Sequence, residues 1–445
     1  MHAGADRHPG LFGGARMTRH IRVIGLDDFH HRQLDTVRHA EQYAFHGLLP
    51  YDMVVHPDAY RIDEMIEEGV RELEEGEAPP DAVIGHWDFP TTALRVIFRD
   101  AYDLRGPTLE SILIAEHKYW SRLRQAMAIP ENIPAFESLD PFDPHAANQV
   151  SMDYPFWIKP NIGFSSQMVY RVDGPDMLAK SLDGLRAGIA RFGEPFERFM
   201  ARASLPDDIP TDLDAYHCTI EKPIDGWQCT VEGYVRHGRV VVYGVVDSVR
   251  EGPMNSSFAR YEFPSQLPES VQERLAELTR RVVPAMELDD TPFNIEYFWD
   301  DEGDQIWLLE VNTRISQSHS PLFIDVAGAS HHEVAIDIAL GRRPSFPRWE
   351  GPHEVAVKFM LRRHEDAVVT RVPTADEIEA LEDDFPGALI RIEVEEGDRL
   401  SDLPGQDAYS YEVAVIFLGG PSHDRVHSLY DELLERLPLS FRPVD

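Results

Sequence analysis

The chain has 445 residues, of which 43% are hydrophobic and 27% charged. This composition is that of a folded globular protein and excludes a disordered, collagen-like or disulfide-stapled chain, and the length suggests about three domains of roughly 150 residues each. Asp and Glu total 78 against 42 Lys and Arg, and the resulting formal charge of −36 repels nucleic-acid phosphates and anionic membrane surfaces.

The rest of the composition favours a cytoplasmic protein. Cys218 and Cys229 are too few for a disulfide framework and suit a reducing compartment. No apolar run approaches the roughly 18 to 20 residues of a membrane span. We therefore expect a protein that binds neither nucleic acid nor membrane. Residues 1–16 lack the apolar core of a secretory signal and are expected to be a disordered tail, with Met17 as an alternative start.

The N-terminal part predicts an α/β unit. Buried strands are expected at 21–26 and 81–87, with a helix at 62–73 between them. Residues 108–127 then show helical spacing and predict one helix. Residues 131–151 contain repeated Pro and Asn and predict a connecting segment at a domain boundary.

A β-rich region follows the connecting segment, and it also contains helices. The expected helices lie at 177–192, 271–286 and 424–437. The expected strands lie at 156–159, 168–172, 229–235, 239–246, 354–360, 388–394 and 410–418, with a hairpin over 293–311.

The hairpin carries the strongest candidate site. Along its second strand, alternation places Trp307, Leu309 and Val311 on one face and Glu310 and Asn312 on the other. Two oxygen-bearing side chains therefore share a face. A solvated sheet surface is the alternative interpretation of such a pattern.

The first strand of the hairpin adds a second carboxylate. If Trp299 pairs with Gln305, Glu296 falls opposite Leu308 and one diagonal step, about 7 to 8 Å, from Glu310. Carboxylate and amide oxygens suit a hard cation such as Mg²⁺. The sequence therefore predicts a magnesium site made by Glu296, Glu310 and Asn312, with manganese as an alternative ion.

A second candidate site lies in the segment FWIKPNIGFSSQ. It reads as a strand followed by a Gly/Ser turn, whose backbone N–H groups and hydroxyls suit an anion. Lys159 stands at the end of the strand, positioned to reach a phosphate, and Gly163, Ser165 and Ser166 form the turn. An ordinary hairpin turn is the alternative.

The third candidate is the segment CTIEKPI, an apolar strand that ends in Glu221, Lys222, Pro223 and Ile224. The proline removes one N–H group and leaves an extended, partly unpaired backbone. Such a backbone suits the edge of a flat heterocycle, although an ordinary passage from strand to turn has the same pattern.

These three segments, in this order and preceded by EHKYW, resemble the ATP-grasp superfamily over roughly residues 20–345. The resemblance implies that Lys118 and Lys159 bind the phosphates of ATP and that the 163–166 turn closes over them. It also implies that residues 221–224 hold adenine and that magnesium lies at the hairpin carboxylates.

The resemblance also implies a fold and a division of the chain. The expected class is α/β with an α+β lid: an N-terminal Rossmann-like domain, an ATP-grasp domain and a C-terminal α+β domain. The expected ranges are 17–110 for the first domain, 111–345 for the second and 346–445 for the third. Within the second, linker helices are expected at 111–150, the lid at 151–235 and a metal-binding subdomain at 236–345.

Two departures from related sequences bear on activity. The string EVNTRISQSHSP resembles a biotin carboxylase motif, but Ser316 and Ser318 replace the glutamine and glutamate that handle bicarbonate there. Gln228 stands where the family usually has an acidic contact to the nucleotide. The overall order is more similar to that of ATP-grasp ligases acting on amino acids.

The resemblance therefore implies an ATP-dependent carboxylate–amine ligase that forms an amide or peptide bond through an acyl phosphate. Arg314 and Lys159 are the expected catalytic residues, and Arg250, Ser316 and His319 the expected contacts to the small-molecule carboxylate and amine substrates. Two alternatives stay open: a carboxylase-like or kinase-like enzyme, and a regulatory nucleotide-binding protein without turnover. A homodimer is also left open, since family members are often dimers.

Overall fold

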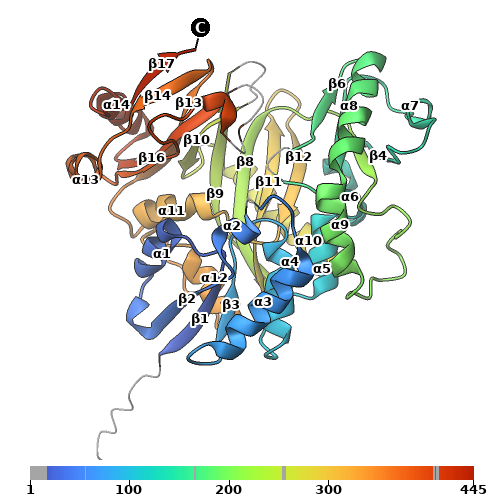
Figure 1. The fold of residues 1–445 in the computed structure, drawn as a ribbon, viewed down its shortest axis with the longest axis horizontal. Helices are drawn as coiled ribbons and strands as arrows, with labels where there is room; N and C mark the ends of the chain where they lie inside the picture. The colour runs from blue at the N-terminus through green and yellow to red at the C-terminus, as the bar shows by residue number, and fades with distance from the viewer. Residues whose placement is uncertain are drawn as a thin grey trace, which may run out of the picture.

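The computed structural model describes residues 18–55, 57–164, 167–252, 257–403, 406 and 410–444. Its N-terminal unit, blue in Figure 1, is a parallel sheet in the order β2-β1-β3, as the α/β pattern predicts. The strands are β1 (Arg19–Ile24), β2 (Tyr43–Leu48) and β3 (Ala82–Ile84), and the helices are α1 (Asp28–Asp35), α2 (Tyr51–Val54), α3 (Ile62–Glu75) and α4 (Thr91–Asp100).

The single helix expected over 108–127 is in fact two helices, α5 (Leu109–Glu116) and α6 (Lys118–Ala128). His117 leaves the helical conformation between them, and its ring nitrogen accepts a hydrogen bond from the Trp120 N–H at 3.3 Å. This histidine therefore caps the second helix. As a result Lys118 is the first residue of α6.

The lid region forms a four-stranded sheet in the order β4-β7-β5-β6. Its strands are β4 (Phe136–Leu139), β5 (Phe156–Pro160), β6 (Tyr170–Val172) and β7 (Cys218–Glu221), and its helices are α7 (Ala146–Gln149), α8 (Pro175–Gly188) and α9 (Ala190–Met200). Two predictions were wrong here. The 131–151 segment contains β4 and α7, and the helix expected at 177–192 is divided between α8 and α9.

The main sheet has eight strands in the order β12-β11-β8-β9-β10-β13-β16-β15. These are β8 (Trp227–Arg236), β9 (Arg239–Glu251), β10 (Ser257–Phe263), β11 (Thr291–Asp300), β12 (Gln305–Asn312), β13 (Val355–Arg363), β15 (Leu389–Ile392) and β16 (Tyr411–Gly420). The C-terminal strands β13, β16 and β15 thus continue the sheet that carries the predicted metal site.

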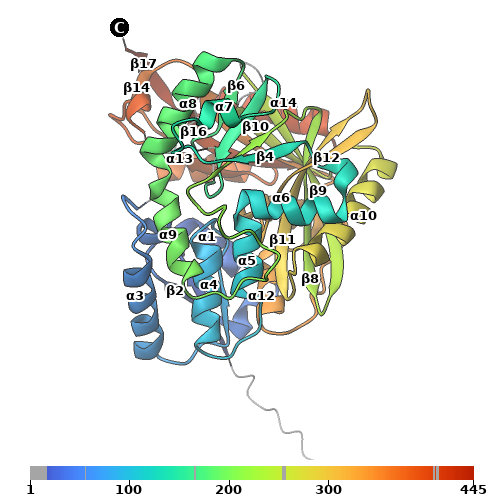
Figure 2. The ribbon, with the colours of Figure 1, turned by 90° about the vertical axis from the view of Figure 1, so that its right-hand side faces the viewer.

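The remaining elements cover this sheet and its C-terminal end. They are α10 (Glu269–Ala285), α11 (Ser320–Ala327), α12 (His332–Ala339), α13 (Ala375–Asp384), α14 (His423–Leu434) and the pair β14 (Ala367–Arg371) and β17 (Ser440–Pro443). In Figure 2, α9 of the lid region descends beside α3, and the two helices are in contact. The lid region and the N-terminal unit therefore touch.

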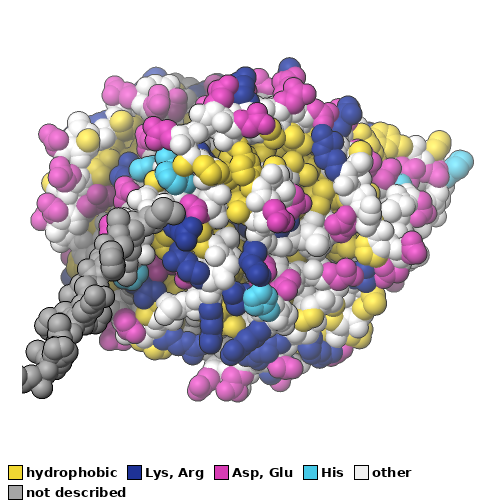
Figure 3. Space-filling view, turned by 90° about the horizontal axis from the view of Figure 1, so that it is seen from below, with side chains coloured by type: hydrophobic (Ala, Val, Ile, Leu, Met, Phe, Trp, Pro, Cys, Tyr) yellow, Lys and Arg dark blue, Asp and Glu magenta, His cyan; other side chains and the backbone are white. Residues whose placement is uncertain are grey.

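Acidic and basic side chains are both spread over the face of the molecule seen in Figure 3, so the acidic excess does not cover that face uniformly. Among the described residues, none of the helices is long and apolar enough to cross a bilayer.

Candidate active site

The hairpin of β11 and β12 brings two carboxylates directly opposite each other. Asp300 pairs with Gln305, and a register shift between Glu296 and Tyr297 places Glu296 opposite Glu310. The predicted register, with Trp299 opposite Gln305 and Glu296 opposite Leu308, was therefore wrong. The turn pairs Asp300 rather than Trp299 with Gln305, and the bulge adds one further residue of shift. The structure makes the carboxylate pair closer than the predicted diagonal.

The bulge also changes which side chains of β12 are buried. Ile306, Leu308 and Val311 are all buried, whereas Trp307 and Leu309 are partly exposed. The predicted grouping of Trp307, Leu309 and Val311 on one face was wrong, because the extra residue shifts the alternation midway along the strand.

The buried Arg122 side chain of α6 holds this bulge. Its guanidinium donates to the carbonyl oxygens of Leu308 at 3.0 Å and Leu309 at 2.8 Å. The same guanidinium donates to Glu221 at 2.7 Å. One arginine therefore links the metal hairpin to the end of the adenine strand, and sequence reasoning did not single it out.

The two opposed carboxylates form a site that fits a divalent cation. Burial and the charge of Glu310 raise the pKa of Glu296 to about 7. Burial alone would also raise the pKa of Glu310, but the ammonium groups of Lys118 and Lys159 hold it below its ordinary value. Burial and the repulsion between the two carboxylates thus both disfavour a second negative charge at this pair, and a divalent cation would offset both effects.

Asn312, the third predicted ligand, lies next to the pair on the same strand. Its side-chain nitrogen donates to the Asn294 side-chain oxygen at 2.9 Å. Asn294 in turn donates to the Arg314 carbonyl oxygen at 3.0 Å. This arrangement fixes the amide and leaves the Asn312 side-chain oxygen available to a cation.

Lys118 joins the hairpin to the Gly/Ser turn. Its ammonium lies 3.4 Å from a Glu310 carboxylate oxygen and donates to the carbonyl oxygen of Gly163. The turn residues Ser165 and Ser166 lie outside the described residues. Of the predicted turn contacts, the structure therefore places Gly163 next to the lysine and the carboxylates.

Lys159 points to the same region from β5. Its ammonium lies 2.7 Å from Glu221, which is also held by Arg122. Burial raises the pKa of Glu221, but the two cations outweigh this effect and lower it to about 2. Glu221 is therefore a fixed anion that positions Lys159 and Arg122.

Beyond Glu221 the backbone is partly engaged. The Lys222 N–H donates to the carbonyl oxygen of Ala135 at 3.0 Å, so this group of the predicted adenine segment is already paired. Pro223 has no N–H group. Among the described residues, no acceptor is found for the N–H group of Ile224.

Gln228 and Arg250 lie beside the carboxylates. The Gln228 side-chain nitrogen donates to Glu296 at 3.0 Å, and its oxygen accepts from Arg250 at 2.8 Å. The Arg250 guanidinium also lies 3.8 Å from the centre of the Phe258 ring. The structure thus connects both predicted residues to the metal carboxylates.

Arg314, the predicted catalytic arginine, is paired across the molecule. It donates to one oxygen of Asp88 through two nitrogens, at 2.7 and 2.5 Å. Asp88 follows β3 in the N-terminal unit, so this pair ties that unit to the sheet.

Next to this pair is a cavity of about 700 Å³. Glu296 and Arg314 line one side of it. The other lining groups include Asp27 and His86 of the N-terminal unit, Tyr261 of β10, Ser316 and His319 after β12, and Lys358, Arg391, Glu393 and Glu412 of the C-terminal segment.

Of the predicted substrate contacts, Ser316 and His319 both line this cavity. His319 is buried, and its Nδ1 lies 2.9 Å from a Glu232 oxygen. Burial and the nearby charges of Lys358 and Arg314 hold the pKa of His319 well below its ordinary value. The imidazole is therefore neutral, with a structural partner on one nitrogen.

The comparisons with known proteins bear on the family and the fold. Residues 152–321 match the family model described as an ATP-grasp domain. The chain carries an ATP-grasp domain. No curated protein matches the sequence.

The fold of nearly the whole chain is similar to that of solved ATP-grasp structures. An L-amino acid ligase from Bacillus licheniformis is 16% identical with a TM-score of 0.73, and the match covers 96% of this chain and 99% of that one. A carboxyaminoimidazole ribonucleotide synthase from Aspergillus clavatus, complexed with ATP, is 16% identical with a TM-score of 0.64. That match covers 95% of this chain and 99% of the other.

A third neighbour is the biotin carboxylase domain of the 2-oxoglutarate carboxylase from Hydrogenobacter thermophilus, in complex with MgADP, ADP and bicarbonate. It is 15% identical with a TM-score of 0.64, covering 96% of this chain and 91% of that one. Together these matches confirm the predicted ATP-grasp fold.

The ATP-grasp match ends at residue 321, and the cavity extends beyond it. His86, Asp88, Lys358 and Arg391 line the cavity and were not predicted as site residues. The available signal was the scarcity of lysine: only five of the 42 basic residues are lysines, and Lys358 is one of them.

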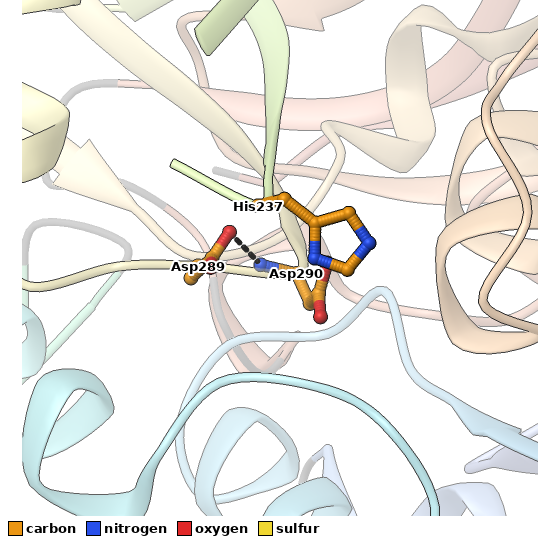
Figure 4. A group of neighbouring side chains, drawn as sticks. All are labelled: His237, Asp289 and Asp290. Atoms are coloured by element: carbon orange, nitrogen blue, oxygen red, sulfur yellow. Dashed lines mark hydrogen bonds between the residues drawn. The ribbon is translucent and has the colours of Figure 1, made fainter. Parts of the chain in front are cut away.

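One other group of metal-ligating side chains occurs in the described part of the chain, formed by His237, Asp289 and Asp290 (Figure 4). It lies at the opposite end of β8 from Gln228. Asp289 accepts from the N–H groups of Gly238 and Asp290 at 3.1 and 2.8 Å. These hydrogen bonds stabilise two turns, which accounts for the group without an ion.

Proposed function

We propose that the protein is an ATP-dependent ligase that joins a small-molecule carboxylate to an amine, forming an amide or peptide bond and releasing ADP and phosphate. The observation that carries this proposal is a pair of opposed carboxylates, Glu296 and Glu310, with Lys118 beside Glu310 and with Glu296 lining a 700 Å³ cavity that Arg314 also lines. The proposed metal site, the proposed phosphate site and a cavity with room for two substrates therefore lie next to one another.

Glu296, Glu310 and the Asn312 oxygen would hold magnesium, with manganese as an alternative. The bound ion would neutralise phosphate charge, which is its usual role in phosphoryl transfer. Lys118 and Lys159 would bind the remaining phosphate oxygens, aided by the backbone at Gly163. Residues 221–224 would contact adenine, for which the Ile224 N–H offers an unpaired donor.

The chemistry follows from the poor electrophilicity of a carboxylate. A carboxylate oxygen attacks the γ-phosphorus of ATP, the bond to ADP breaks, and an acyl phosphate forms. The amine then attacks the acyl carbon, phosphate leaves, and the amine loses a proton. The protein contributes positioning and charge neutralisation rather than a covalent step.

Arg314 is placed to act on the transferred group. Its pairing with Asp88 fixes the guanidinium at the cavity wall, where it would donate two hydrogen bonds to the substrate carboxylate or the acyl phosphate. His319 lines the same cavity as a neutral imidazole, and we assign it and Ser316 to substrate contact rather than to the metal.

The test is ADP release from MgATP over pairs of amino acids, with the product identified by mass. Release that requires both a carboxylate and an amine, with a product of the summed mass less water, is expected. Release that does not depend on any amine would favour a carboxylase-like or kinase-like enzyme. No release with any pair would favour a regulatory protein.

Glu310→Ala is the matched variant. We expect its turnover to fall to background, because the cation loses half of its carboxylate pair, while the fold is retained. Lys180→Ala, which changes an exposed residue of α8, is expected to turn over normally. Full activity of Glu310→Ala would place the metal elsewhere.

A further inference from the structure

Lys358 of β13 is a buried cation that faces the cavity. Lys358 is 8% exposed, and it lines the cavity together with Tyr261 and His319. The ammonium lies 5.4 Å from the centre of the Tyr261 ring and 6.0 Å from that of Phe417. Neither ring supplies a hydrogen-bond acceptor of the strength that an ammonium requires.

Within the described part of the chain, the Lys358 ammonium has neither a hydrogen bond nor an ion pair. The two nearest carboxylates are engaged elsewhere: Glu393 binds Arg391, and Glu412 lies 2.9 Å from Arg362. Each of these carboxylates therefore has an arginine as its partner, whereas the Lys358 ammonium has no carboxylate partner among the described residues. Burial lowers the pKa of Lys358 to about 8, below its ordinary value but still above neutrality.

A buried ammonium without a partner is costly unless something else supplies the anion. Here the open side of the ammonium is the cavity. Because Glu393 and Glu412 are paired with arginines, the ammonium offers its one positive charge to the cavity, which suits a monoanion better than a doubly charged phosphate. The chemistry that fits is a carboxylate.

The position of Lys358 identifies which carboxylate. Directly paired residues share a face of a sheet, and a chain of such pairs places Lys358 on the same face as Glu296, four strands away. At roughly 4.8 Å per strand, this is about 19 Å along the sheet. The pairs are Glu296 with Thr230 and Thr230 with Val246, then Ser248 with Tyr261 and Tyr261 with Lys358. Val246 and Ser248 join the two halves, because residues two apart on one strand share a face.

The carboxylate that is phosphorylated must meet the phosphates next to Glu296, so it does not reach Lys358. We propose that Lys358 binds the carboxylate of the amine substrate, which is therefore an amino acid rather than a simple amine. This inference rests on the proposed ligase function. It assigns a specificity-determining role to a residue of the C-terminal segment, outside the ATP-grasp match.

The test compares amino acids with their carboxamides, which keep the amine and lose the anion. Dissociation constants are measured by calorimetry on the full chain with MgADP present, and KM values by ADP release. For the wild type we expect tighter binding of an amino acid than of its amide. For Lys358→Met we expect this preference to fall roughly 10- to 100-fold, with the amide unaffected.

Lys358→Gln provides a second, polar replacement, and Lys180→Met removes the charge of an exposed lysine as a control. Thermal unfolding and MgADP binding report whether each variant is folded. Equal binding of amino acid and amide by the wild type, or equal weakening of both in the folded Lys358 variants, overturns the inference. So does the absence of amino-acid binding.

The two proposals fail separately. Amino-acid binding that depends on Lys358 without any amine-dependent ADP release would refute the ligase and leave the carboxylate site. Amine-dependent ADP release with no preference for an amino acid over its amide would support the ligase and refute the carboxylate site at Lys358.

Discussion

At the scale of single residues, the site is defined by unequal compensation of charge. Glu221 is matched by Arg122 and Lys159, and its pKa lies far below the ordinary value. Among the residues that the structure describes, the Gln228 amide donates a hydrogen bond to Glu296, and the pKa of Glu296 is raised to about 7. Two cations therefore offset the charge of Glu221, whereas the charge of Glu296, a proposed metal ligand, is disfavoured by burial and by Glu310.

The raised pKa of Glu296 predicts a pH dependence of stability. A carboxyl whose folded pKa exceeds its unfolded value of 4.5 favours the folded state when protonated, so this contribution is present at low pH and is lost as the pH rises towards 7. Without metal, we expect Glu296→Gln to be more stable than the wild type at pH 8, by up to about 3 kcal/mol.

Thermal unfolding with and without MgCl₂ at pH 5 and 8 measures this effect. Magnesium is expected to stabilise the wild type at pH 8 and to have little effect on Glu296→Gln. A wild type whose stability is insensitive to magnesium at both pH values would contradict the assignment. Asp301→Asn, in the exposed turn between β11 and β12, serves as the control for loss of one carboxylate.

At the scale of elements, the bulge in the β11–β12 hairpin decides the geometry of the site. It brings Glu296 opposite Glu310, and Arg122 of α6 holds its carbonyl oxygens. The hairpin therefore depends on a helix that lies far from it in the sequence.

Replacing Arg122 with Met should lower the free energy of unfolding by about 3 to 5 kcal/mol, because Glu221 would remain buried beside Lys159 alone and the bulge would lose its donors. Urea unfolding measures the loss. The double variant with Glu221→Gln should recover part of it. Wild-type stability of Arg122→Met would show that the bulge does not need this guanidinium.

The sequence predicted this hairpin and placed the candidate ligands Glu296, Glu310 and Asn312 on it, but it did not predict the register. Alternation identifies strands, whereas a bulge depends on donors supplied from elsewhere in the fold. The helix break at His117 was missed for a similar reason, because the cap that it provides resembles an ordinary helical residue. Strand β4 was missed because its Pro- and Asn-rich surroundings hide a pairing with β7.

At the scale of the whole molecule, the cavity is bounded by three separate parts of the chain. The N-terminal unit contributes His86 and Asp88, the central strands contribute Glu296 and Arg314, and the C-terminal strands contribute Lys358. The C-terminal contribution could not be predicted, because sequence gives no indication that β13 pairs with β10. The division between the second and third domains at residue 345 stays a prediction. In the structure, one continuous sheet contains strands from both sides of this boundary.

This continuity predicts the effect of truncation. Removing residues 346–445 would expose the edge of β10 and the apolar residues that pack beneath β13 and β16, and unpaired apolar edges promote aggregation. We expect the truncated chain to be insoluble or to elute as large aggregates in size-exclusion chromatography. A monodisperse truncated chain that still binds MgADP would show that the C-terminal segment folds independently of the sheet.

The order of the strands has a temporal consequence. Strand β16 is the last of the eight to be synthesised, yet it lies inside the sheet, between β13 and β15. During translation β15 has no neighbour to pair with until β16 emerges from the ribosome. Arg391 thus reaches its place in the cavity wall only when the polypeptide is nearly complete.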